Sequence, residues 1–273
     1  MLALAACPGL AHAKSCVWKV TGPDGKVLYL GGTLHRLQSQ DYPVPAAYNR
    51  AFELSQRLAF EDPPPSVGAG QSLEKRALYP KGDELKNHVD PRTYEYVLKV
   101  FGRAGTPPEK VARFRPWYLA FLVSSGKTNS GPGVESYFSG RAQIYHRSIE
   151  GLESNDAHLA VFSGLSDRQG EAFLLLRFIA VKDVGKADDS KLSAAWRNGD
   201  ADYLQRYVHA EYRDYPAMAD RLLGERNRAW IPKIESWIKS NQTYFVLAGA
   251  GHFGGPNGVI ALLRARGYQI EQW

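Results

Sequence analysis

The sequence predicts an α/β fold with a mixed β-sheet. The prediction rests on two apolar strands near opposite ends of the chain, each followed by the pattern Gly-x-x-His. The strand at 27–30 runs into the pattern that ends at His35, and the strand at 244–248 runs into the one that ends at His252. A side chain just past the C-terminal end of such a strand lies at the edge of the sheet where ligands usually bind. Two such units can therefore bring two imidazoles together.

Patterning at the N-terminal end predicts a βαβ unit. Residues 17–20 and 27–30 are apolar and flank a Pro-Asp-Gly turn, which indicates a β-hairpin. Residues 46–56 carry apolar side chains at helical spacing, and residues 58–61 form a short strand. A strand, a helix and another strand in this order place the two strands parallel. The Pro- and Gly-rich stretch 63–70 is the best candidate for a linker.

The middle of the chain is expected to be mostly helical. Between the two strand–GxxH units lies a large helical insertion, spanning roughly 71–240, which we expect to cover the site. The predicted elements from this insertion to the C-terminus are a strand at 149–153, helices at 193–208 and 214–239, the second interrupted at Ile231-Pro232, a strand at 244–248, a helix at 258–266 and a strand at 268–272.

Composition is that of a soluble globular protein able to bury a substantial core. The chain has 273 residues, of which 44% are apolar and 23% charged. The net charge is +6, but the basic residues are dispersed, so we expect no nucleic-acid partner. No stretch approaches the ~18 apolar residues of a membrane span.

The first residues resemble the end of a secretory signal peptide. An apolar start is followed by Ala11-His12-Ala13, an A-x-A cleavage pattern, so residues 1–13 are predicted to be the signal and residues 14–273 the domain. We therefore expect the protein to be periplasmic or secreted. Leu4 to Cys7 also fit a lipoprotein box, which would attach the protein to a membrane through a lipid on Cys7, and a cytosolic tail is the third alternative. With only Cys7 and Cys16 in the chain, we expect no structural disulfide.

Three residues at predicted strand ends form the candidate metal site. His35 and His252 follow their strands, and Glu61 ends the strand expected beside the one that carries His35. Two histidines and a carboxylate, with an open position for water, are the arrangement of catalytic divalent metals. Glu153 ends the short strand at 149–153 and is a candidate second carboxylate or general base.

Competing motifs are weaker. Residues 249–254 match G-x-G-x-x-G, but the chain ends too soon afterwards for a dinucleotide-binding sheet. Neither G-x-S-x-G, nor H-E-x-x-H, nor a Walker loop occurs. The remaining histidines and the tryptophans of helical segments are expected to be surface or core residues: His88, His146, His158, His209, Trp117, Trp196, Trp230 and Trp237.

At these motifs the chain resembles the TraB/GumN family, which includes the Tiki metalloproteases. The resemblance spans nearly the whole chain and rests on the paired GxxH, Phe60-Glu61, the segments at 133–135 and 151–153, and Glu225-Arg226-Asn227. It implies a metal held by His35, His252 and Glu61. It also implies that Arg226 holds a substrate carbonyl or carboxylate. Where the family often has Asp, this chain has Glu135, so the role of that carboxylate stays open.

These observations favour a metal-dependent hydrolase of the cell envelope. The expected substrate is a peptide or a small polar molecule, and the expected metal is Mn²⁺, Co²⁺ or Zn²⁺. The alternative is a non-catalytic protein that captures a peptide or glycan in the same cleft. Gly32 and Gly249 are expected to have special backbone geometry, because glycine permits a tight turn; the alternative is that they pack closely against a neighbouring element.

Overall fold

The computed structural model describes residues 14–64, 69–124, 131–183 and 188–273. The predicted signal peptide with Cys7 lies outside the described residues, as does part of the predicted linker at 63–70. None of the described helices combines the length and the apolar composition that a bilayer crossing requires.

A six-stranded mixed sheet forms the centre of the fold. Its strand order is β6-β4-β7-β2-β1-β8. The four strands β6, β4, β7 and β2 run parallel to one another, whereas β1 and β8 are antiparallel to their neighbours. The predicted hairpin and the predicted parallel strands are therefore confirmed. The strand that leads to Glu61 was expected beside the strand that leads to His35, and this is wrong, because β7 lies between β4 and β2 and pairs with both. The strands are β1 (Val17–Thr21), β2 (Val27–Thr33), β4 (Arg57–Phe60), β6 (Ile149–Gly151), β7 (Tyr244–Gly249) and β8 (Gln269–Gln272).

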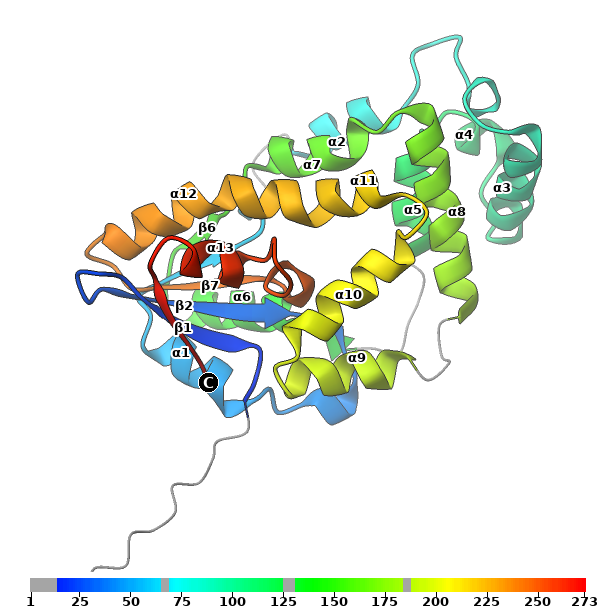
Figure 1. Ribbon diagram of the computed structural model, residues 1–273. Coiled ribbons are helices and arrows are strands. Elements are labelled where there is room, and N and C mark those ends of the chain that lie inside the picture. Colours follow the sequence, from blue (N-terminus) through cyan, green and yellow to red (C-terminus); the bar gives the residue numbers. More distant parts are fainter. Residues whose placement is uncertain (1–13, 65–68, 125–130, 184–187) are drawn as a thin grey trace, which may run out of the picture.

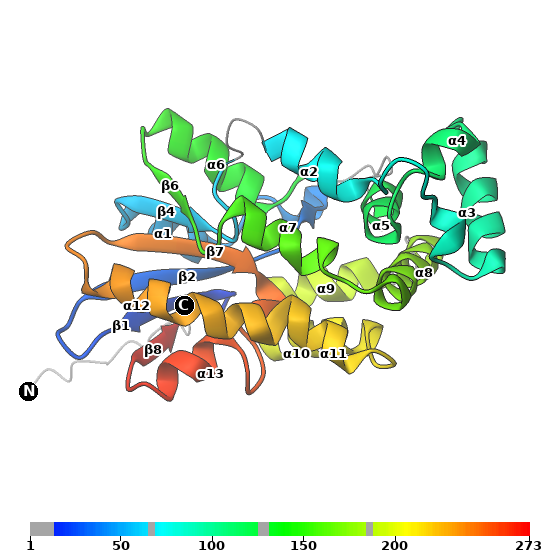
Figure 2. The same ribbon diagram turned by 90° about the horizontal axis from the view of Figure 1, so that it is seen from above.

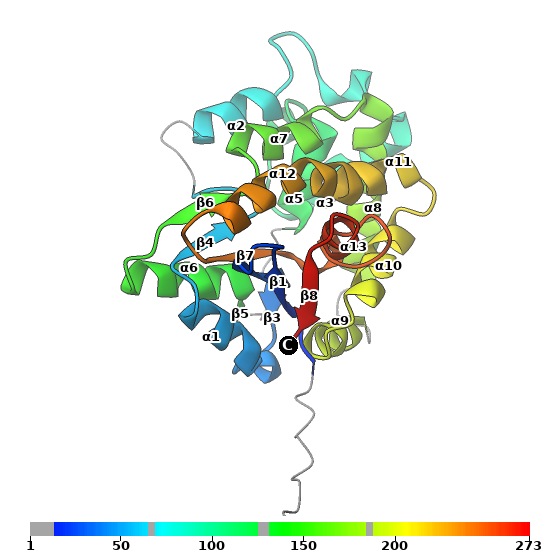
Figure 3. The same cartoon turned by 60° about the vertical axis from the view of Figure 1, so that its left-hand side comes forward.

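Helices cover both faces of this sheet. Neighbouring residues of β7 point to opposite sides: the ring of Phe245 packs against Tyr48 and Phe138, while Tyr244 stacks on Trp237. Helix α1 (Ala46–Glu53) and helix α6 (Val134–Ile144) thus lie on one face, and α12 (Glu225–Lys239) lies on the other (Figures 1 and 3). The predicted core tryptophans are all buried: Trp117, Trp196, Trp230 and Trp237.

Part of the helical insertion forms a lobe beyond one end of the sheet, with a second apolar core of its own (Figure 2). The β2 arrow points toward this lobe and α10 (Figure 1). The helices not yet named are α2 (Ala69–Ala77), α3 (Pro91–Arg103), α4 (Pro108–Val111), α5 (Pro116–Ser124), α7 (Asn155–Ser163), α8 (Asp167–Asp183), α9 (Asp188–Arg197), α10 (Ala201–Glu211), α11 (Pro216–Ala219) and α13 (Val259–Arg264).

Two boundaries differ from the expected ones. The predicted interruption at Ile231-Pro232 is wrong, because α12 continues through Pro232. Burial of Ile231 and Ile234 in the core outweighs the loss of one backbone hydrogen bond. The predicted helix at 193–208 is instead split into α9 and α10 at Gly199, whose φ of 74° lies in the left-handed region. Short elements escaped prediction: β3 (Arg36–Leu37) pairs with β5 (Gly131–Pro132).

The GxxH glycines have ordinary backbone geometry, which corrects the expectation. Gly249 has φ −48°, and Gly32 is not among the described glycines with positive φ. Close packing explains them instead. A Cβ at Gly32 would lie 2.9 Å from the Cβ of Ala250 and 3.0 Å from that of Cys16. A Cβ at Gly249 would lie 3.2 Å from the Oε1 of Glu61.

An ion-pair clasp fastens α8 to the loop after α2. His88 lies 2.8 Å from Asp167 through Nδ1 and 2.8 Å from Asp83 through Nε2, and its ring stacks on Tyr79. Carboxylates only accept hydrogen bonds, so both ring nitrogens donate and His88 is an imidazolium. Although burial lowers the pKa of His88, the hydrogen bonds to Asp167 and Asp83 raise it above its ordinary value.

We expect His88→Gln to lower the melting temperature more at about pH 5.5 than at about pH 9. A histidine with a raised pKa stabilises the fold fully below its unfolded-state value near 6.5, and this contribution disappears as the pH rises through the folded-state pKa. The pKa of Asp83 is lowered to about 2, so the acceptor is lost only in stronger acid. Thermal denaturation at both pH values tests this, and an equal difference at both would contradict the clasp.

Candidate functional site

The carboxyl edge of the parallel strands brings the predicted site residues together. Thr33 at the end of β2 pairs with Gly249 at the end of β7, and Phe60 at the end of β4 pairs with Gly151 at the end of β6. The side chains of interest lie one to three residues beyond these four ends: His35, His252, Glu61 and Glu153. Strands far apart in sequence thus end at one edge of the sheet, next to these polar residues.

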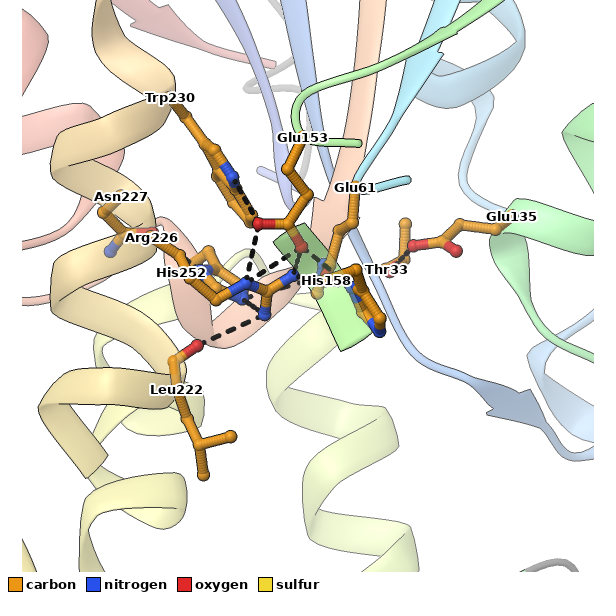
Figure 4. A network of polar contacts seen from close by, with 11 residues as sticks. Thr33, Glu61, Glu135, Glu153, His158, Leu222, Arg226, Asn227, Trp230 and His252 are labelled. Atoms are coloured by element: carbon orange, nitrogen blue, oxygen red, sulfur yellow. Dashed lines mark hydrogen bonds and ion pairs between the residues drawn. The ribbon is translucent and has the colours of Figure 1, made fainter. Parts of the chain in front are cut away.

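Arg226 joins the two glutamates of this edge. It comes from the first turn of α12 and is 8% exposed. Its Nη2 donates to Glu61 Oε2 at 2.5 Å and to Glu153 Oε1 at 2.6 Å, while its Nε lies 3.2 Å from Glu153 Oε1 (Figure 4). A buried guanidinium shared by two carboxylates fixes all three side chains.

A π-helical turn, Asp220–Gly224, directs Arg226 into the site. It immediately precedes α12, and its Leu222 carbonyl accepts a hydrogen bond from Arg226 Nη1 at 3.2 Å. The guanidinium also lies 4.8 Å above the ring of Trp230, whose Nε1 donates to Glu153 Oε2. Such turns are rare and occur frequently at functional sites. The aromatic ring and the carbonyl thus add two further contacts that hold the guanidinium in place.

His158 is a site residue that sequence reasoning missed. It was expected to be a surface or core residue, yet its Nδ1 lies 2.8 Å from Glu153 Oε1. Ser154 caps α7 directly after Glu153, so one helical turn later His158 faces back toward the strand end. Within the described residues, Glu61, Glu153 and His158 form the group whose potential metal-ligand atoms lie within 4.8 Å of one another. The sequence did carry a signal for this contact: Glu153 precedes the helix-capping Ser154, and His158 follows that serine by four residues, about one helical turn.

His252 is buried and held in one tautomer. Asn227 donates through Nδ2 to the carbonyl of Asn257, so its Oδ1 faces His252 Nδ1 at 2.6 Å and must accept. The Nε2 lone pair of His252 is therefore directed at Arg226 Nη1, 3.2 Å away, with Glu61 Oε1 at 3.8 Å. Burial lowers the pKa of His252 to about 4, outweighing the nearby Glu61 carboxylate. The imidazole is therefore neutral at pH 7, and its unprotonated Nε2 accepts a hydrogen bond from Arg226.

The two central glutamates are ionised. Burial opposes the charge on Glu61, but His252, Arg226 and the amide N–H of Gly249 hold the pKa of its carboxyl well below the usual range. That amide donates to Glu61 Oε1 at 2.7 Å. Burial likewise opposes the charge on Glu153, and the hydrogen bonds from His158 and Arg226 lower its pKa. Among the groups that face these two carboxylates are the guanidinium of Arg226 and the imidazole of His158, whose pKa is lowered by burial but raised above its ordinary value by the hydrogen bond to Glu153.

His35 and Glu135 lie beside this centre. His35 is solvent-exposed and does not belong to the tight group. Glu135, in the first turn of α6, accepts a hydrogen bond from Thr33 Oγ1 at 3.0 Å. Burial, together with the charge on Glu61, raises the pKa of Glu135 to about 8. The sheet edge thus carries a neutral carboxylic acid next to two ionised ones.

A cavity of about 330 Å³ opens next to the glutamates. Glu153, Arg226 and Trp230 line it together with residues of α7 and α12. The turn that carries His252 is covered by α10. Among the described residues a larger hollow, of about 800 Å³, lies where Ser15 and Trp273 meet, away from these side chains.

Comparison with known proteins identifies the family. The profile of the TraB/PrgY/gumN family matches residues 16–272. The chain belongs to this family. An uncharacterized protein of Treponema pallidum (strain Nichols) is 25% identical, covering 97% of this chain and 85% of its own length. No solved structure matches.

Two further relatives carry a functional name. A "Metalloprotease TIKI homolog" of Amphimedon queenslandica is 22% identical over 97% of this chain, and "Metalloprotease TIKI1" of Danio rerio is 22% identical over 89% of it. The chain spans 63% and 60%, respectively, of the length of these two proteins. The resemblance inferred from the paired GxxH is thereby confirmed at the level of the family.

Proposed function

We propose that this protein is a metal-dependent hydrolase that cleaves peptide bonds at the carboxyl edge of its sheet. The observation that carries the proposal is the group formed by Glu61, Glu153 and His158, with the neutral imidazole of His252 alongside. Similarity to proteins named metalloproteases supports the reaction class. We further propose that the protein acts in the periplasm or outside the cell, with a lipid on Cys7 as the alternative to secretion.

The donor atoms at the site are of the types that Mn²⁺, Co²⁺ and Zn²⁺ bind. Carboxylate oxygens and a neutral imidazole nitrogen are usual ligands of these ions. Two ligand sets are available: the tight group of Glu61, Glu153 and His158, and the set of Glu61, His252 and His35 that the resemblance implies. Glu61 belongs to both, so we propose it as the central ligand. When bound, a divalent ion lowers the pKa of a coordinated water.

The surrounding residues suit the remaining steps of a hydrolysis. Glu153 is the candidate acceptor for the proton of the attacking water, because the hydrogen bonds from His158 and Arg226 keep its carboxylate ionised. Arg226 offers N–H groups to a substrate carbonyl or carboxylate. We propose that the helical insertion covers the site, since α7, α10 and α12 surround the edge and α7 and α12 line the adjacent cavity.

A non-catalytic binding protein is the second candidate. The hydrogen bonds from Arg226 to both glutamates favour it, because they satisfy the carboxylates without any metal. Such a protein would capture a peptide or glycan in the same cleft. Metal-dependent turnover separates the two candidates.

The deciding experiment incubates the purified protein with a peptide library, in the presence of a chelator or of Mn²⁺, Co²⁺ or Zn²⁺. We expect cleavage with metal and none with chelator. His35→Ala should reduce the rate, whereas His209→Ala, on the exposed surface of α10, should leave it unchanged. A low rate that neither metal nor chelator alters would favour the binding protein.

Gly249→Ala is expected to impair hydrolysis with little loss of stability. The added methyl group would lie 3.2 Å from Glu61 Oε1, so the carboxylate must shift by a few tenths of an ångström. A shift of this kind lowers kcat/KM about 10-fold, because positioning errors near the reacting atoms are costly. Kinetics and melting curves test this against Gly102→Ala, whose methyl group meets nothing within 4 Å. Full activity of Gly249→Ala would contradict the placement of Glu61.

A further inference from the structure

Arg226 holds the position that a metal ion would need. Its Nη2 lies 2.5 Å from Glu61 Oε2, 2.6 Å from Glu153 Oε1 and 3.4 Å from His158 Nδ1. The carboxylates of Glu61 and Glu153 thus both accept hydrogen bonds from the same guanidinium nitrogen, and the imidazole of His158, the third residue of the tight group, lies beside it (Figure 4).

An ion bonded to these atoms could not coexist with the guanidinium. Metal–oxygen and metal–nitrogen bonds are about 2.0–2.2 Å long, so an ion shared by the two glutamates would overlap Nη2. Two positive charges in contact would also repel each other strongly in a site with so little water. Arg226 has its side chain 9% exposed, as do both glutamates.

The structure offers room for the displaced side chain. Arg226 and Trp230 line the cavity of about 330 Å³, together with Arg221 and the exposed carboxylate of Glu225. A rotation of the Arg226 side chain toward this cavity keeps the guanidinium near Trp230 and a carboxylate. The two glutamates would then be free to bind a divalent cation, and their charges would be neutralised by it instead.

We propose that Arg226 and a divalent metal ion exclude each other from the Glu61–Glu153 pair, so that Arg226 sets how tightly the site binds metal. The inference rests on the proposed function for the identity of the site and goes beyond it. Arg226 is then a resident counter-cation, which keeps the site closed to metal until its side chain moves. Removal of the guanidinium leaves the two carboxylates without the cation that they share and favours the ion.

The test measures Mn²⁺ binding by the electron paramagnetic resonance signal of the free ion, without reference to activity. R226M should bind Mn²⁺ at least about 10-fold more tightly than the wild type. R226K retains a cation and should bind like the wild type. R221M is the matched control, since Arg221 lines the same cavity but donates to the carbonyls of Val161 and Ala160. The gain should vanish in the E61Q/R226M double variant.

Equal Mn²⁺ affinities of the wild type and R226M would overturn the proposal. If R226M folds poorly, a nuclear magnetic resonance measurement on the wild type tests the proposal instead. Its Arg226 Nε–H resonance, assigned by its absence in R226K, should shift during a Zn²⁺ titration, and an unchanged resonance at saturating Zn²⁺ would overturn the proposal. Tight binding by R226M with none by the wild type supports the exclusion and contradicts the metal-dependent function. Equal Mn²⁺ affinities of the two proteins, together with metal-dependent peptide cleavage, would support the proposed function and contradict the exclusion.

Discussion

Glu61→Gln is expected to reduce kcat/KM for peptide cleavage by about 10³-fold or more. The substitution keeps the size of the side chain and removes the charge that both candidate ligand sets share. Loss of a metal ligand or of a group that handles a proton costs about two to four orders of magnitude. Glu61 contacts Arg226, His252 and the amide of Gly249, so its replacement affects every part of the centre.

The fold should survive this change. Arg226 retains its hydrogen bonds to Glu153, so the uncompensated cost is about 1–3 kcal/mol. Glu150→Gln is the matched control, because that carboxylate lies in β6 and contacts Tyr244 and Arg57 instead. Steady-state kinetics and melting curves on the three proteins measure both effects. If Glu61→Gln retained half of the wild-type rate, the assignment of the centre would be wrong.

Gly32→Val is expected to give the largest loss of stability. The Cβ position is already 2.9 Å from Ala250 and 3.0 Å from Cys16, so a valine forces β2 and the His252 turn apart. Overpacking of a close contact costs about 3 kcal/mol, which lowers the melting temperature by roughly 6–12 °C for a domain of this size. Calorimetry of Gly32→Val beside Gly140→Val, whose side chain meets open space, measures the difference.

The melting temperature of Gly32→Val distinguishes two reasons for a glycine at this position, which are close packing and a special backbone conformation. A glycine required for its backbone conformation at an exposed turn would lose local geometry while the rest of the fold persisted. Close packing at Gly32 instead makes the whole sheet edge depend on the missing side chain. A melting temperature within about 2 °C of the wild type would contradict the packing account.

Much of the fold could be predicted from the sequence because its signals are local. Alternating and continuous apolar runs mark strands, and the order of strand, helix and strand makes the strands parallel. Parallel strands share a carboxyl edge, so Glu61, Glu153 and His252 could be placed near one another. The position of β7 between β4 and β2 depends instead on which strands pair, and pairing of distant segments leaves no mark in either segment alone.

What escaped prediction depends on tertiary contacts. His158 reaches Glu153 because Ser154 caps α7, which fixes the residue at which the helix begins and therefore the direction in which His158 points. Pro232 stays helical because its neighbours are buried, and neither fact is visible in the local pattern. Arg226 could be singled out by resemblance, but its simultaneous contact with two glutamates follows from how α12 lies across the sheet edge.

The position of bound metal tests the central claim most directly. Crystals grown with Mn²⁺ or Zn²⁺ should give an anomalous difference peak about 2.0–2.2 Å from a Glu61 carboxylate oxygen. At least one imidazole should complete the coordination, and the Arg226 side chain should have moved away from Glu61. Peptide cleavage that continues in a protein whose only peaks lie elsewhere, with Glu61 still bonded to Arg226, would contradict the account.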